Sequence, residues 1–303
     1  MKVIILGAGA IGSLYGAKLS KLNDVTLVGR QEHVDKINKD GLKISGEENT
    51  AYRLKATTKI KEIKDNTLII LTTKVIGSKN AIEPIKSLIK KDTIILCLQN
   101  GLHSEDAVKK IVKDNCLVLR GITAVGATFL EPGVVQFNNL SYTKIEKSPI
   151  SKELADNFNK CGLKANVSEN LKEDVWKKLI VNCVLNPTSA ILRVDNNGLS
   201  NEKLNPLKRS IINECLKIAK KDGVIFDIDF VKSINKAVKG SKNLSSMLQD
   251  IIKGNKTEID YLNGAVVELG RKYGIKCPVN EGLVMIIKGM EQNLNNNANK
   301  FLK

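Results

Sequence analysis

The sequence predicts an α/β fold in its amino-terminal half and an all-helical fold in its carboxyl-terminal half. Three observations carry this prediction. Short apolar runs alternate with helix-compatible segments, a glycine-rich turn follows the first run, and helical periodicity dominates from Ser151 onward. At 303 residues, the chain is long enough for two domains, which we expect at 1–168 and 169–303.

The composition is that of a globular protein, with 42% hydrophobic and 26% charged residues. No apolar run approaches the ~18 to 20 residues that a membrane-spanning helix needs, so a membrane is not an expected partner. The six cysteines include no Cys-x-x-Cys pair and mostly lie in apolar runs, which is typical of buried thiols in a reducing compartment. We therefore expect a cytoplasmic protein, and the presence of only two histidines argues against a metal site.

The net charge of +16 suggests nucleic-acid binding, but the residue types argue against it. Only six of the 48 basic residues are Arg, and aromatic residues make up 4% of the chain. Base recognition favours Arg, and single-strand binding favours aromatic stacking. A surface rich in dispersed Lys is better suited to attracting small anions, so we do not expect a nucleic-acid partner.

The first element is an apolar run, Val3 to Leu6, of the kind found in strands buried on both faces of a parallel sheet. A Gly-x-Gly-x-x-Gly motif follows at once, then a helix-compatible stretch and a second apolar run from Val25 to Val28. In this context the three glycines allow a tight turn, close approach of a pyrophosphate, and close packing of helix on strand. The motif predicts a Rossmann-type dinucleotide-binding domain whose cofactor contacts are Gly7, Ala8, Gly9, Ala10, Ile11 and Gly12.

The end of the second run indicates which dinucleotide binds. NAD-binding domains usually place Asp or Glu there to accept from the ribose hydroxyl, whereas this chain has Arg30. Since a guanidinium suits a 2′-phosphate, we expect NADPH, held in part by Arg30.

Three more apolar runs follow at Leu68–Leu71, Ile94–Leu98 and Leu117–Leu119, and Gly121–Gln136 predicts further strands and a turn. Lys74 and Asn100 come shortly after the first two of these runs. Because the carboxyl ends of parallel strands face the ligand crevice, we expect both residues near the nicotinamide half of the cofactor.

The carboxyl-terminal half contains a series of predicted helices and, from 293 to 303, an Asn-rich tail expected to fray. The predicted helices are Ser151–Cys161, Leu171–Arg193, Glu202–Asp222, Asp229–Val238, Leu244–Lys253, Lys256–Tyr273 and one that begins at Glu281.

One of these helices is apolar almost throughout from Leu179 to Pro187, yet it carries polar residues every fourth position at Lys178, Asn182 and Asn186. This spacing puts the three side chains on one helix face. Burying them without partners is costly, so the stripe predicts a polar cleft. The alternative is a helix bridged by buried Asn hydrogen bonds, with Lys178 reaching solvent.

A second informative segment surrounds Glu258. Gly254 ends one predicted helix, and Asn255 with Glu258 three residues later fits an amino-terminal capping pair. The structural interpretation of Glu258 is therefore a cap partner. The functional one is a carboxylate that faces a cleft and holds a substrate hydroxyl.

A nicotinamide cofactor implies hydride transfer, and reduction of a carbonyl leaves an alkoxide that must be protonated. No Tyr is followed four residues later by Lys, which argues against the short-chain dehydrogenase acid. His103 is a weak candidate for the acid of a lactate-type enzyme. The strongest candidate is a lysine of the helical half, whose ammonium can stabilise an oxyanion and donate a proton.

Taken together, these motifs resemble those of the ketopantoate reductase (2-dehydropantoate 2-reductase) family over essentially the whole chain. The glycine motif is shared with many dehydrogenases, but two strings are specific, Ser245-Ser246-Met247-Leu248-Gln249-Asp250 and Thr257-Glu258-Ile259-Asp260-Tyr261. The other matching features are Thr73-Lys74, Gln99-Asn100-Gly101, and Trp176-Lys177-Lys178-Leu179 with Asn182 and Asn186-Pro187.

The resemblance implies NADPH-dependent reduction of 2-dehydropantoate to (R)-pantoate, in pantothenate and coenzyme A biosynthesis. By position, Lys178 matches the general acid and Glu258 the carboxylate that orients the substrate. The positions that match substrate-binding residues are Asn100, Asn182, Asn186, Asn197, Asn243 and Ser246, while Arg30, Lys74 and Asn100 match cofactor contacts. Lys177 beside Lys178, and Asn196 beside Asn197, leave two of these positions ambiguous by one residue.

Other functions stay open at this point. The chain could reduce another small branched 2-keto acid with NADPH, or sense a dinucleotide without turnover. The expected partner is a small keto acid, and a homodimer is compatible with the sequence.

Overall fold

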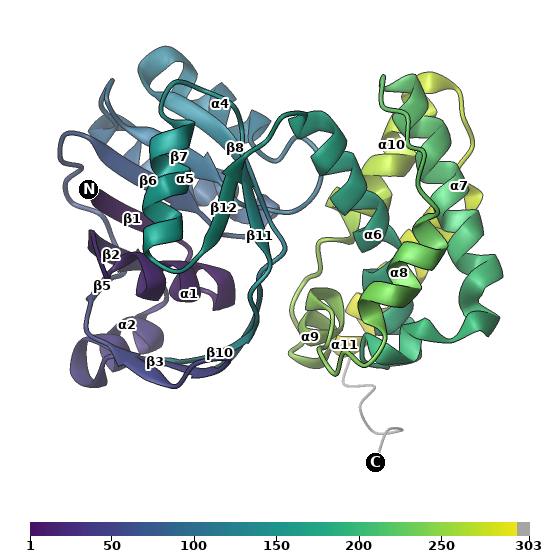
Figure 1. The fold of residues 1–303 in the computed structure, drawn as a ribbon, viewed down its shortest axis with the longest axis horizontal. Helices are drawn as coiled ribbons and strands as arrows, with labels where there is room; N and C mark the ends of the chain where they lie inside the picture. The colour runs from purple at the N-terminus through teal and green to yellow at the C-terminus, as the bar shows by residue number, and fades with distance from the viewer. Residues whose placement is uncertain (296–303) are drawn as a thin grey trace. The chain divides into compact units, whose positions relative to one another are not determined.

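The computed structural model describes residues 1–295, which fall into two units (Figure 1). Unit 1 contains residues 1–99 and 103–171, and unit 2 contains residues 100–102 together with the chain from Lys172 onward. Unit 1 holds the strands and unit 2 is built of helices, so the predicted fold class is confirmed.

Unit 1 is organised around an eight-stranded sheet with the order β12-β11-β8-β7-β6-β1-β2-β5. Six neighbouring strands of this sheet, β5-β2-β1-β6-β7-β8, are parallel. Numbered along the chain, they have the order 3-2-1-4-5-6 of doubly wound sheets. All five predicted apolar runs form strands of this sheet. The strands are β1 (Lys2–Leu6), β2 (Asp24–Val28), β5 (Lys55–Thr57), β6 (Thr67–Leu71), β7 (Ile94–Cys97), β8 (Leu117–Thr123), β11 (Tyr142–Ile145) and β12 (Lys164–Val167).

Both faces of this sheet are covered. Alternate residues of β1 enter different apolar clusters, with Val3 and Ile5 in one and Ile4 and Leu6 in the other. The covering helices of unit 1 are α1 (Ala10–Leu19), α2 (Gln31–Asp40), α3 (Ser78–Ile82), α4 (Asp106–Val112) and α5 (Ser151–Lys160), with 3₁₀ turns η1 (Val75–Gly77), η2 (Glu83–Leu88) and η3 (Lys113–Asn115).

A second, four-stranded sheet of unit 1 has the order β4-β3-β10-β9. Its strands are β3 (Leu42–Gly46), β4 (Thr50–Tyr52), β9 (Gly126–Glu131) and β10 (Val134–Asn139). The turn predicted at Pro132-Gly133 joins β9 to β10, and Gly133 adopts a φ of +80° there.

In the described part of unit 2, every element is a helix or a 3₁₀ turn. They are α6 (Leu171–Leu192), η4 (Asn197–Ser200), η5 (Glu202–Leu204), α7 (Asn205–Lys221), α8 (Phe230–Val238), α9 (Ser246–Ile252), η6 (Ile259–Tyr261), α10 (Asn263–Tyr273) and α11 (Pro278–Asn295). Within residues 1–295, no helix combines the length and the apolarity that crossing a bilayer requires.

The predicted helix at Lys256–Tyr273 is wrong at its start, because α10 begins only at Asn263. Thr257 Oγ1 accepts from the N–H of Ile259, and the chain makes the η6 turn before the helix begins. The capping pair of Asn255 and Glu258 therefore does not form. Helix α11 extends into the predicted frayed tail as far as Asn295, and the rest of that tail lies outside the described residues.

Candidate functional site

The glycine motif of unit 1 forms the turn between β1 and α1. Gly7 has a φ of +109°, and a Cβ there would lie 2.6 Å from the backbone nitrogen of Thr73. A Cβ on Gly12 would lie 2.2 Å from the carbonyl oxygen of Gly7. These two positions require glycine for close packing within the unit.

Gly9 differs from the other two glycines, because a Cβ there would meet nothing within 4 Å. Gly9 is exposed and is the N-cap residue of α1, and no side chain caps the first N–H groups of this helix. Such a terminus is suited to an anion. A glycine that has room for a side chain, at an uncapped helix start, fits a loop that a pyrophosphate approaches closely.

Two further predicted cofactor residues follow the carboxyl ends of β2 and β6, the two strands that flank β1. Arg30 follows the carboxyl end of β2 and is exposed, and Lys74 follows β6 and is half-buried. The ends of these strands are in register with the end of β1, where Leu6 pairs with both Val28 and Leu71. Thr72 donates its hydroxyl to the carbonyl of Gly7 at 2.8 Å, which fixes the β6 end to the glycine turn.

The two histidines lie in different surroundings in unit 1. His33 is 3% exposed; its Nδ1 accepts from the N–H of Gly133 at 2.9 Å, and its Nε2 lies 3.0 Å from Ser13 Oγ. Burial lowers the pKa of His33. His103 is exposed, with Nδ1 3.4 Å from Asp106 Oδ2. His33 therefore joins structural elements of unit 1.

The polar stripe of α6 lies in unit 2, on a helix that also buries apolar residues such as Leu179, Ile180 and Val184. Asn186 is 6% exposed, Lys178 and Asn182 are half-buried, and the neighbouring Lys177 is exposed. Helix geometry thus directs the side chains of the two adjacent lysines to different faces, and only Lys178 shares a face with the two asparagines.

Lys178, Asn100 and Glu258 form a hydrogen-bonded chain within unit 2. The Nζ of Lys178 donates to Asn100 Oδ1 at 2.7 Å, and Asn100 Nδ2 donates to Glu258 Oε2 at 3.1 Å. One amide therefore holds the ammonium with its oxygen and the carboxylate with its nitrogen. Such an arrangement places a proton donor and a hydrogen-bond acceptor on either side of a neutral bridge.

The remaining predicted substrate residues are also in unit 2. Ser246 is exposed as the first residue of α9, whereas Ser245 is buried and caps that helix by accepting from the N–H of Leu248 at 3.1 Å. Asn243 is half-buried. Of the two serines, Ser246 is thus the accessible one.

Asn196 and Asn197 differ in how their amide oxygens are engaged. Asn197 Oδ1 accepts from the N–H of Gly240 at 2.7 Å, a contact that joins two loops. Asn196 donates its N–H to the carbonyl of Asn243 at 2.9 Å, and its buried Oδ1 has no hydrogen-bond partner among the described residues. Asn197 is the predicted contact and Asn196 its one-residue alternative, and the amide oxygen of Asn197 is the one already engaged in a hydrogen bond.

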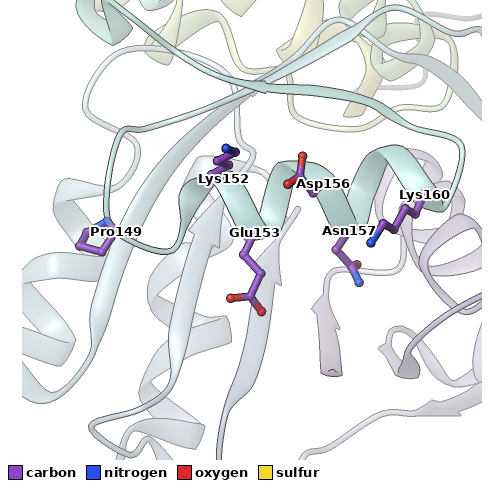
Figure 2. A pocket seen from close by; sticks show the side chains of 6 residues that line it. All are labelled: Pro149, Lys152, Glu153, Asp156, Asn157 and Lys160. Carbon is purple, nitrogen blue, oxygen red and sulfur yellow. The ribbon is translucent and has the colours of Figure 1, made fainter.

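A hollow on unit 1 runs along the outer face of α5 (Figure 2). It contains none of the predicted site residues, and its charged side chains carry both signs, so it offers no preference for an anionic ligand. It is lined by Pro149, Lys152, Glu153, Asp156, Asn157 and Lys160.

Comparison with known proteins gives consistent results over both halves of the chain. Residues 3–149 match the sequence model of a family described as ketopantoate reductase PanE/ApbA, and residues 170–291 match the model of its C-terminal region. The 2-dehydropantoate 2-reductase of Pyrococcus horikoshii is 39% identical over 299 residues, which are 96% of this chain and 98% of that protein. The enzyme of the same name from Lactococcus lactis is 34% identical, again covering 96% of this chain and 98% of that protein.

Solved structures agree with this result. A PanE/ApbA family ketopantoate reductase from Ralstonia eutropha has a TM-score of 0.90 at 28% identity, covering 97% of this chain and all of that one. D-mandelate dehydrogenase in a ternary structure with NADH and anilino(oxo)acetate has a TM-score of 0.89 at 31% identity, covering 97% of this chain and 99% of that one.

Proposed function

This chain belongs to the ketopantoate reductase PanE/ApbA family, and from that premise we propose that it reduces 2-dehydropantoate to (R)-pantoate with NADPH. The reaction would serve pantothenate and coenzyme A biosynthesis in the cytoplasm. The observation that carries the proposal is the chain of Lys178, Asn100 and Glu258, which joins a proton donor to a carboxylate through one amide.

The glycine turn of unit 1 would hold the cofactor. The open space at Gly9 and the uncapped start of α1 fit a pyrophosphate, and the cationic Arg30 at the end of β2 fits a 2′-phosphate. Lys74, at the end of β6, would lie toward the nicotinamide half. When bound, NADPH supplies the hydride that a ketone carbon accepts.

Lys178 would supply the proton. Reduction of the ketone leaves negative charge on its oxygen, and an ammonium can stabilise that charge before it donates a proton. Asn100 Oδ1 holds the Lys178 Nζ at 2.7 Å, which limits the rotamers available to a long side chain. The hydride and this proton together convert the ketone to an alcohol.

Glu258 would orient the substrate by accepting from its hydroxyl group. Asn182, Asn186, Asn243 and Ser246 would hold the carboxylate and the remaining polar groups, with either Asn196 or Asn197 as a further contact. All of these side chains belong to unit 2. Because the keto acid is an anion, the excess of Lys on this protein would favour its approach.

A second candidate is reduction of a different 2-keto acid. The similarity to D-mandelate dehydrogenase favours it, since that protein, solved with NADH, is 31% identical over nearly the whole chain. The substrate and the cofactor are therefore tested together.

The experiment follows the loss of NADPH absorbance when the purified protein is given ketopantoate, with NADH as the alternative cofactor. Branched 2-keto acids without the terminal hydroxymethyl group and an aryl 2-keto acid complete the panel. We expect ketopantoate with NADPH to give the highest kcat/KM, because the analogues leave Glu258 without a hydroxyl to accept from. A higher kcat/KM for an analogue would identify that analogue, and not ketopantoate, as the preferred substrate. NADPH binding without turnover of any keto acid would favour a dinucleotide sensor.

A further inference from the structure

Helix α6 contains a proline in its interior, and this proline leaves a buried carbonyl without its helical partner. Pro187 has no N–H, so the carbonyl oxygen of Cys183, four residues earlier, cannot accept the usual helical hydrogen bond. Cys183 is 0% exposed, so water cannot replace the missing donor. A buried carbonyl of this kind needs a partner from elsewhere in the fold.

That partner is Asn263, the first residue of α10. Its Nδ2 donates to the Cys183 carbonyl at 3.0 Å and to Asn280 Oδ1 at 2.9 Å, so both amide hydrogens are used. Asn263 is 0% exposed, and its own Oδ1 has no hydrogen-bond partner among the described residues. The fold therefore uses the two donors of this side chain and tolerates an unpaired acceptor.

The orientation of the Asn263 amide is fixed by its neighbours. Asn280 donates from its Nδ2 to Glu214 Oε2 at 2.7 Å, which turns Asn280 Oδ1 toward Asn263 as an acceptor. Glu214 also accepts from the backbone N–H groups of Val279 and Asn280, each at 2.9 Å, at the start of α11. A carboxylate on α7 thus anchors the network that ends on the Cys183 carbonyl.

The position of this bond along the chain links it to the candidate catalytic groups. Cys183 lies five residues after Lys178 on the same helix, and Asn263 lies five residues after Glu258. We infer that Asn263 is a positioning residue, which ties the α6 backbone to the segment carrying Glu258 and so sets the Lys178 ammonium relative to the carboxylate. This inference rests on the proposed function.

The test is a double-mutant cycle between residues 263 and 187. Asn263→Leu keeps the number of side-chain heavy atoms but removes both donors. Pro187→Ala restores an N–H that can donate to the Cys183 carbonyl, so it replaces the donor that Asn263 supplies. Each variant and the double variant are assayed for kcat, KM for the keto acid, Kd for NADPH, and Tm.

We expect Asn263→Leu to lower kcat by about 10- to 100-fold with the NADPH Kd unchanged, because small misplacements of reacting groups reduce rates steeply. In the Pro187→Ala background, the loss should shrink severalfold. Equal losses of kcat in the two backgrounds, or no loss in either, would overturn the inference.

Thermal unfolding separates this inference from the proposed function. If the unmodified protein does not reduce ketopantoate, the proposed function fails, but Asn263→Leu should still lower Tm by several degrees, and by less in the Pro187→Ala background. Equal Tm losses in both backgrounds would show that Asn263 does not serve the Cys183 carbonyl. Should Asn263→Leu fail to fold, Asn263→Ser, which keeps one donor, is placed in the same cycle and judged by the same criteria.

Discussion

Unit 1 forms the candidate pyrophosphate site from the backbone of one continuous stretch, residues 7–12, whereas unit 2 assembles its candidate catalytic group from side chains far apart in sequence. Lys178 and Asn100 are 78 residues apart, and Asn100 and Glu258 are 158 apart. The first kind of site depends on open space and on the N–H groups at the start of a helix that no side chain caps. The second depends on which elements the fold brings together.

This difference teaches which measurement should respond to changes in each unit. A substitution in the glycine turn of unit 1 should change cofactor affinity, because it alters a surface that a phosphate approaches. A substitution in the polar cluster of unit 2 should change turnover at nearly constant cofactor affinity, because it removes a proton donor or its support.

The largest effect should come from the unit 2 cluster. Lys178→Ala should lower kcat by about 10² to 10⁴-fold, the usual contribution of general acid catalysis. Lys177→Ala is the matched control, since Lys177 is adjacent but exposed and should retain nearly full activity. Steady-state NADPH oxidation gives kcat, and fluorescence titration gives the NADPH Kd. A raised Kd with normal turnover in Lys178→Ala would contradict the role of this lysine.

Two glycines of unit 1 should respond oppositely to the same added methyl group. Gly12→Ala should destabilise the fold by roughly 1–3 kcal/mol, because its Cβ would meet the Gly7 carbonyl oxygen at 2.2 Å. Gly9→Ala should leave the Tm nearly unchanged, because its Cβ meets nothing within 4 Å, yet it should weaken NADPH binding. Denaturant unfolding and NADPH titration of both variants measure the contrast. Unaltered NADPH affinity in Gly9→Ala would show that the pyrophosphate does not bind at this turn.

Arg30 should decide between the two nicotinamide cofactors. Arg30→Asp should weaken NADPH binding by about tenfold or more, since it replaces a charged hydrogen bond to the 2′-phosphate with repulsion. NADH binding should change far less. Arg53→Asp, at another exposed arginine of unit 1, controls for the change in net charge. Equal weakening of both cofactors in Arg30→Asp would mean that this side chain does not contact the 2′-phosphate.

The smallest expected effect is a pH dependence of stability in unit 1. Because burial lowers the pKa of His33 in the folded protein, the unfolded chain takes up a proton first as the pH falls through about 6.5. Its contribution to stability is therefore complete above that pH and is lost below it. Protonation of His33 Nδ1 would also break its hydrogen bond with Gly133, because a protonated nitrogen cannot accept from the Gly133 N–H.

His33→Gln should accordingly show a smaller fall in Tm between neutral and mildly acidic pH than the unmodified protein. His103→Gln provides the comparison, because His103 is exposed. The same pH slope in both variants would exclude His33 as the titrating group.

The local features of the chain were predictable from its sequence. The apolar runs became strands of the main sheet, and the helix predicted at Leu171–Arg193 is α6 at Leu171–Leu192. These elements follow from hydrophobic periodicity and from glycine geometry, which act over a few residues. The spacing of Lys178, Asn182 and Asn186 likewise predicted a shared face because helix geometry alone determines it.

What could not be predicted depends on distant partners. The start of α10 was expected seven residues too early, because a local Asn and Glu pattern resembles a helix cap while Glu258 instead accepts from Asn100. Asn263 was missed for the same reason. Pro187 signals that the Cys183 carbonyl needs another donor, but no local pattern says that this donor lies 80 residues further along the chain.

The chain crosses between the two units three times, because residues 100–102 belong to unit 2 although the residues on either side of them belong to unit 1. Gln99 donates to the Thr73 carbonyl and to Ser78 Oγ, each at 2.8 Å, within unit 1, while the next residue, Asn100, belongs to unit 2. The chain enters unit 2 for residues 100–102, returns to unit 1, and leaves it again after Leu171. No single proteolytic cut or gene truncation can therefore separate the units intact. A fragment that begins at Lys172 would lack Asn100, so its lysine and its carboxylate would lose the amide that joins them.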